Sequence, residues 1–170
     1  VGKSIAEIDL ALKVGVGCFN VESRSELERI QHRAELAQKV APISVRVNPD
    51  IDANTHPYIS TGLKDNKFGV DAETALTLYS MAAKTNALSI EGIDCHIGSQ
   101  IARTEPLLEA LNSILNLVDT LSSSGIELQH VNLGGGFGVR YQDEHPLDLN
   151  AYGAQLHELL GPRQLPLRLE

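Results

Sequence analysis

Hydrophobic residues along the chain fall into short continuous runs, separated by longer stretches in which they recur every three or four positions. The runs predict strands at residues 17–21, 43–47, 90–95, 130–133 and 165–169. Each run is apolar nearly throughout, which is typical of strands that are buried on both faces of a parallel sheet.

The stretches between the runs have the spacing of amphipathic helices, and several begin with residues that favour a helix start. The predicted starts are the capping-box pairs Ser4/Glu7 and Ser23/Glu26 and the N-cap Asp71, and two further helices are predicted at 104–124 and about 149–160. Gly15 and Gly125 are predicted to end the helices that precede them.

A strand followed by a helix, repeated along the chain, predicts parallel βαβ units and an α/β fold. Two architectures fit: an open doubly wound sheet, or part of a (β/α)₈ barrel. In both, ligands bind beyond the carboxyl ends of the strands. The residues that follow each predicted strand are therefore the candidates for function, together with the long polar loop at 48–69.

A glycine-rich run, Gly134 to Gly138, follows the fourth predicted strand. Successive glycines let a backbone approach a ligand, and their N–H groups can form a nest for a phosphate or carboxylate. The run is not the dinucleotide fingerprint, because Val139 occupies the position of its last glycine. A tight turn would need only one or two glycines, so anion binding is favoured.

His96 and Ser99 follow the third predicted strand. A histidine here could be a general base, a metal ligand, a flat surface for a ring, or a structural residue. A zinc site is not expected, because no second His or Cys stands at ligand spacing. Arg46, at the end of an apolar strand, needs an anionic ligand or an acidic partner such as Glu22.

The composition narrows the class of protein. The chain has 170 residues, 42% of them hydrophobic, and 14 basic against 22 acidic side chains give a net charge of −8, which argues against nucleic acid and anionic membranes as partners. Cys18 and Cys95 each lie in an apolar run, as expected of reduced thiols in a cytoplasmic protein. Both ends look cut, so a piece of a longer protein is expected.

The motifs of the chain occur in the order found in one enzyme family. They are Val-Arg-Val-Asn-Pro-Asp at 45–50, the loop from Thr55-His56-Pro57 through Ser60-Thr61-Gly62 to Lys67-Phe68-Gly69, His-Ile-Gly-Ser-Gln at 96–100, the glycine run and Glu170. Through these motifs and their order, the whole chain of 170 residues resembles the pyridoxal-phosphate-dependent decarboxylases of the alanine-racemase-like fold type. The resemblance implies that residues 1–170 are a partial (β/α)₈ barrel, from after the third strand to the end of the eighth, without the family's C-terminal β-domain.

The resemblance also implies roles for individual residues. His96 would stack on the pyridine ring of the cofactor, Ser99 with Gly134, Gly135 and Gly136 would hold its phosphate, Arg46 would lie near its phenolic edge, and Glu170 would pair with its ring nitrogen. The family's Schiff-base lysine and catalytic cysteine lie outside the chain. Alone, the chain is therefore expected to be inactive, and its six lysines are expected to be surface groups.

The loop at 48–69 is most similar to the family branch that converts meso-diaminopimelate to L-lysine and CO₂. The resemblance implies that the full-length enzyme is a homodimer in the cytoplasm. It also implies an amino acid as substrate and no metal. The alternatives are a relative that acts on arginine, ornithine or carboxynorspermidine, and a non-catalytic barrel that binds the cofactor. A nucleotide-binding domain is disfavoured, because Gly2-Lys3-Ser4 lacks the strand and first glycine of a P-loop.

Overall fold

A computed structural model describes residues 2–51, 68–141 and 146–170. The loop motifs at 55–57 and 60–62, and Lys67, lie outside the described residues. Within the described residues, no helix is both long and apolar enough to cross a membrane.

Five parallel strands form one sheet. They are β1 (Phe19–Val21), β2 (Ala41–Arg46), β3 (Leu88–Asp94), β4 (His130–Asn132) and β5 (Leu167–Arg168). Each strand pairs with the next one along the chain, in the order β1-β2-β3-β4-β5. A doubly wound sheet reverses its order at a switch point, whereas a barrel does not. The strand order therefore decides between the two predicted architectures in favour of an arc of a (β/α)₈ barrel.

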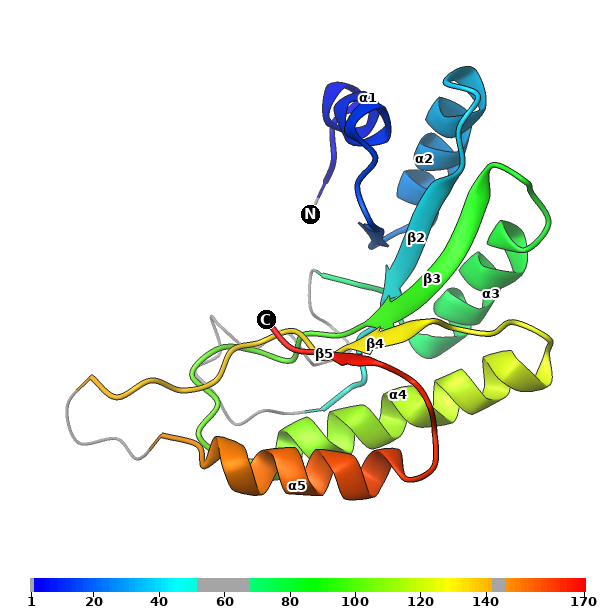
Figure 1. The fold of residues 1–170 in the computed structure, drawn as a ribbon. Coiled ribbons are helices and arrows are strands. Elements are labelled where there is room, and N and C mark those ends of the chain that lie inside the picture. The colour runs from blue at the N-terminus through cyan, green and yellow to red at the C-terminus, as the bar shows by residue number, and fades with distance from the viewer. Residues whose placement is uncertain (1, 52–67, 142–145) are drawn as a thin grey trace.

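Five helices accompany the strands. They are α1 (Ile5–Val14), α2 (Arg24–Leu36), α3 (Ala72–Ala82), α4 (Glu105–Ser123) and α5 (Leu149–Leu160). Figure 1 shows α2, α3, α4 and α5 along one side of the curved sheet, and both chain termini near the arrowheads of the strands. The inward faces of the helices and the sheet share one hydrophobic core, in which Ile43, Val45, Ile93, Leu111 and Val131 are fully buried.

Local capping residues explain where most of the helices begin. Ser4 and Glu7 form the complete capping box that their spacing predicts. Asp71 accepts a hydrogen bond from the N–H of Thr74 at 2.7 Å and starts α3. The helix predicted from residue 104 is also present, but the side chain of Thr104 makes no capping bond.

The second predicted capping box is only half formed. The hydroxyl of Ser23 accepts from the N–H of Glu26 at 3.2 Å, as expected of an N-cap. The Glu26 carboxylate does not return to Ser23; its Oε2 atom accepts from the N–H of Glu22 at 2.9 Å. The reciprocal half of this prediction is wrong, because the carboxylate instead accepts hydrogen bonds from the Glu22 N–H and from Nζ of Lys3.

A tyrosine from α3 bridges the two longest strands. The pairing of β2 with β3 shifts register between Ile43 and Ser44. At this point the N–H of Val45 donates to the Tyr79 hydroxyl at 3.4 Å, and that hydroxyl donates to the carbonyl of Gly92 at 2.7 Å. Burial raises the pKa of Tyr79, so the hydroxyl keeps its proton. The bridge satisfies backbone groups that the irregularity would otherwise leave unpaired.

Candidate functional site

The carboxyl ends of the strands surround a cleft of about 540 Å³. Its lining residues are Lys3, Cys18, Asn20, Glu22, Arg46, Asp94, Cys95, His96, Asn132, Gly134 and Glu170. Four of the predicted site residues therefore meet in it: Arg46, His96, Gly134 and Glu170. The parallel topology accounts for this, because it brings every strand end to the same edge of the sheet.

Arg46 is held between an acid and an aromatic ring. Its Nη1 atom lies 3.3 Å from Oε1 of Glu22, and the two side chains are 15% and 13% exposed. The Phe68 ring lies under the guanidinium, 5.4 Å from Cζ to the ring centroid. The predicted pair with Glu22 is thus confirmed. The Nε atom is buried and has no hydrogen-bond partner among the described residues.

His96 presents an uncharged ring to the cleft. Burial lowers its pKa below the ordinary histidine value, and the nearby charge of Arg46 lowers the pKa further. The Nδ1 atom accepts from the N–H of Gly135 at 3.4 Å. A Cβ atom on Gly134 would lie only 2.6 Å from this nitrogen, so glycine is required there for the ring to take its place.

Ser99 and the glycine run are neighbours in space. A Cβ atom on Gly136 would strike the carbonyl of Gly98 and lie 3.2 Å from Cα of Ser99. Gly136 also has a φ of 89°, in the region that favours glycine. The segment after β3 and the segment after β4 therefore run against each other, and side chains would separate them.

Gly135 is required for close packing and not for its backbone conformation. Positive φ values occur at Gly134 and Gly136, but not at Gly135. A Cβ atom on Gly135 would instead collide with the backbone carbonyl of Glu170. Close packing against the end of the chain, rather than backbone conformation, thus excludes a side chain.

Asn132 organises one side of the cleft and was not predicted from the sequence. Its amide nitrogen donates to Oε1 of Glu170 at 2.7 Å, and its amide oxygen accepts from the N–H of Gly134 at 2.8 Å. The N–H of Glu170 in turn donates to the carbonyl of Gly134 at 2.9 Å. The available signal was a polar residue inside the otherwise apolar run at 130–133. A phosphate bound at the Gly134 N–H would have to replace Asn132.

Asp94 is a buried carboxyl group at the end of β3. It is 5% exposed and accepts from the hydroxyl of Ser44 at 2.8 Å. Burial raises its pKa to about 6, although Ser44 and the charge of Arg46 both act to lower it. The charges of Glu22 and Glu170 add to the increase.

Cys18 and Cys95 carry free thiols that line the cleft. Burial raises the pKa of each to about 12. At neutral pH both thiols therefore keep their protons, and neither has the character of a nucleophile.

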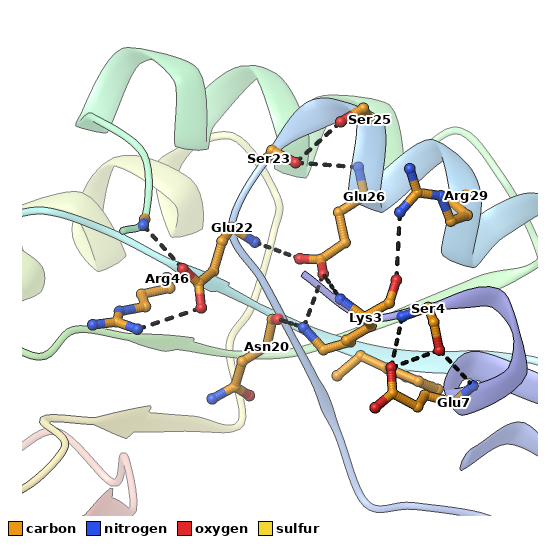
Figure 2. Close-up of polar contacts among 12 residues, drawn as sticks. Lys3, Ser4, Glu7, Asn20, Glu22, Ser23, Ser25, Glu26, Arg29 and Arg46 are labelled. Atoms are coloured by element: carbon orange, nitrogen blue, oxygen red, sulfur yellow. Dashed lines mark hydrogen bonds and ion pairs between the residues drawn. The ribbon is translucent and has the colours of Figure 1, made fainter. Parts of the chain in front are cut away.

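Lys3 is not the surface group that its position predicted. Its side chain is 23% exposed, and Nζ donates to Oε1 of Glu26 at 3.1 Å and to the carbonyl of Asn20 at 2.5 Å. Figure 2 shows this lysine in the segment before α1, with its side chain reaching the Glu26 carboxylate at the start of α2 and the carbonyl of Asn20. The expectation for Lys3 is wrong, because its partners lie more than fifteen residues away in sequence.

Comparisons with known proteins agree on one group of enzymes. The family model described as "pyridoxal-dependent decarboxylase, pyridoxal binding domain" matches residues 1–164. The diaminopimelate decarboxylases of Neisseria meningitidis serogroup B and Pseudomonas aeruginosa are 56% and 53% identical to the whole chain, which covers 41% of each. The crystal structure of the Helicobacter pylori diaminopimelate decarboxylase with L-lysine aligns with a TM-score of 0.97 at 42% identity, over all of this chain and 43% of that one.

Proposed function

Because the model of the pyridoxal-binding domain matches residues 1–164, this chain belongs to the pyridoxal-dependent decarboxylases, and we propose that the full protein decarboxylates meso-diaminopimelate to L-lysine and CO₂. The chain spans about 41% of the length of the curated relatives it matches. Two relatives above 50% identity that are named diaminopimelate decarboxylase support this substrate over arginine, ornithine or carboxynorspermidine. The single observation that carries the proposal is the meeting of Arg46, His96, Gly134 and Glu170 in one cleft.

The residues of the cleft fit pyridoxal phosphate. A ligand with an aromatic ring and a phosphate group needs a flat, neutral side chain against the ring and a backbone without side chains around the phosphate. His96 would offer the first, and Gly134 in the cleft, with Gly135, Gly136 and Ser99 next to it, would offer the second. The buried, unpartnered Nε of Arg46 adds a donor for an oxygen of the ligand.

When bound, pyridoxal phosphate supplies an aromatic ring that accepts the electrons released with CO₂. Glu170 would hold a proton on the ring nitrogen, and Asn132 fixes the Glu170 carboxylate for this role by donating to Oε1 at 2.7 Å. A charged acceptor that is already oriented costs no reorganisation when the proton must be held.

His96 and Arg46 would orient the ring from two directions. His96 would pack against the face of the ring as a neutral imidazole, which avoids placing a second cation beside Arg46. Arg46, fixed by Glu22 and Phe68, would donate toward the phenolic edge. The lysine that binds the cofactor covalently and the catalytic cysteine would come from outside residues 1–170, the cysteine from the partner subunit of a cytoplasmic homodimer.

The test uses the full-length protein that contains this chain. Purified enzyme loaded with pyridoxal phosphate should release CO₂ from meso-diaminopimelate, and arginine and ornithine should give much less. Apoprotein provides the baseline. Preferred turnover of arginine or ornithine would overturn the substrate proposal, and cofactor binding without turnover of any amino acid would favour the non-catalytic barrel.

A further inference from the structure

Glu26 is a buried carboxylate that lies outside the cleft, in the first turn of α2. The residue is 4% exposed. Its Oε1 atom accepts from Nζ of Lys3 at 3.1 Å and from the backbone N–H of Lys3 at 3.3 Å. Its Oε2 atom accepts from the backbone N–H of Glu22 at 2.9 Å. Figure 2 shows the carboxylate between these donors.

These donors keep Glu26 ionised in spite of its burial. Burial alone would raise the pKa of the carboxyl group, but the hydrogen bonds from the Glu22 N–H and from Lys3 outweigh burial and bring the pKa below its ordinary value. Loss of a partner would leave a buried charge uncompensated, which is costly. The position of the carboxylate is therefore strongly tied to Lys3 and Glu22.

Glu22 connects this carboxylate to the cleft. While its backbone N–H is held by Glu26, its own carboxylate contacts Nη1 of Arg46 through Oε1 and the N–H of Gly69 through Oε2, each at 3.3 Å. Glu22 follows β1 directly, so the peptide that Glu26 holds is the one that sets the direction of the Glu22 side chain. Two hydrogen-bonded steps thus lead from Glu26 to the guanidinium of Arg46.

We propose that Glu26 is a positioning residue for Arg46. By fixing the Glu22 peptide, the Glu26 carboxylate aims the Glu22 side chain, which holds the guanidinium over Phe68 at the edge of the cleft. Lys3 anchors Glu26 from the opposite side. The inference rests on the proposed function in one respect, namely that Arg46 contacts the cofactor.

The test is a double-mutant cycle in the full-length enzyme, with the affinity for pyridoxal phosphate and the visible circular dichroism of the bound cofactor as readouts. Glu26→Gln removes one acceptor and places an amide donor against the donors of Lys3 or Glu22. It should weaken cofactor affinity roughly tenfold, the usual effect of losing one charge-assisted hydrogen bond. In an Arg46→Lys background the same change should cost far less, because residues that act through one another are not additive.

Glu28→Gln is the matched control. Glu28 lies on the same helix and pairs with Arg24, and both side chains are at least half exposed. This variant removes the same charge and should leave affinity and dichroism unchanged. The crystal structure of apo Glu26→Gln should show the Arg46 guanidinium displaced from Glu22 and Phe68.

Additive effects of Glu26→Gln and Arg46→Lys, or an Arg46 that stays in place in the variant, would overturn the positioning role and leave the proposed function intact. A wild-type enzyme that does not bind pyridoxal phosphate would overturn both. If Glu26→Gln does not fold, Glu26→Asp takes its place in the cycle, since it keeps the charge but is too short to reach both Lys3 and Glu22. The same non-additivity is expected, and additivity would again reject the role.

Discussion

The ring of His96 lies in the cleft, where burial lowers its pKa and keeps it neutral. Replacement by alanine removes a flat packing partner at the end of β3 without disturbing the core. We expect His96→Ala in the full-length enzyme to weaken pyridoxal phosphate binding by about 1 kcal/mol, or roughly fivefold, and to lower turnover. Fluorescence titration of apoenzyme gives the affinity. His157→Ala on the exposed face of α5 is the control, and an unchanged affinity in His96→Ala would make His96 a structural residue.

Asp94 should make the stability of the protein depend on pH. Its pKa of about 6 in the folded state is above the ordinary value of 3.8, so the folded protein binds the extra proton between these pH values. The contribution to stability is fully present below about pH 4 and is lost as the pH rises through about 6, and the pKa difference corresponds to roughly 3 kcal/mol. Asp94→Asn removes the titration. The difference between the melting temperatures of the variant and the wild type should therefore shift in favour of the variant from pH 4 to pH 7. A difference that stays constant over this range would show that the pKa of Asp94 is not raised in the folded state.

The sequence could identify these residues only where local pattern and topology agree. Arg46 lies near the end of one apolar run and His96 follows another, and the rule that ligands bind at the carboxyl ends of strands correctly brought them together. Lys3 and Glu26 have no such signal. Their contact joins positions 23 residues apart, and the local spacing of Ser23 and Glu26 pointed to a different partner. A local pattern cannot reveal a competitor that only the folded chain brings near.

At the scale of elements, the helix caps differ in a way that can be measured. Asp71 makes a capping bond at the start of α3, whereas Thr104 at the start of α4 makes none. Asp71→Ala should therefore cost about 1 kcal/mol of stability, and Thr104→Ala should cost close to nothing. Urea unfolding of the two variants checks the difference. Equal losses would mean that the cap geometry does not govern these helix starts.

The glycine run should be sensitive because it packs against β5 and the residues after it. Valine at position 135 would push against the backbone carbonyl of Glu170. We expect Gly135→Val to abolish the binding of pyridoxal phosphate and also to weaken that of pyridoxal, because Glu170 moves together with the phosphate site. Equilibrium dialysis with both ligands tests this. Gly153→Ala is the control, because a Cβ atom there meets nothing within 4 Å, and a loss confined to pyridoxal phosphate would argue that only the phosphate is affected.

Strands were predictable at their centres and less so at their ends. All five apolar runs became strands, but β3 begins at Leu88, before the predicted start at 90, because Ser89 interrupts the apolar pattern there; Glu91 is a second polar residue within the strand. These two side chains bond to each other at 2.5 Å, which lets polar residues remain within the strand. The register shift that Tyr79 bridges had no sequence signal either, since it depends on a hydroxyl from α3.

For the whole molecule, the 170-residue chain alone should show no decarboxylase activity and no specific covalent attachment of pyridoxal phosphate. Covalent attachment requires a lysine whose amine is free to attack, and Nζ of Lys3, in the cleft, is engaged by Glu26 and Asn20. Borohydride reduction followed by mass spectrometry should therefore find scattered, substoichiometric labelling. Stoichiometric labelling of Lys3, or of Lys67 outside the described residues, would mean that the chain holds more of the active site than proposed.

The consecutive order of the strands also has a consequence for synthesis on the ribosome. Each strand pairs with the one made just before it, so every pairing can form as soon as the next strand and helix emerge. The cleft is assembled differently, because its walls come from the ends of successive strands, and Glu170, which follows β5, is made after the other residues that line it. Arg46 and Glu22 can therefore meet early in translation, while Glu170 joins them only after β5 has been made. A nascent chain would thus build its scaffold unit by unit, and this side of its cleft would be complete only after β5 has formed.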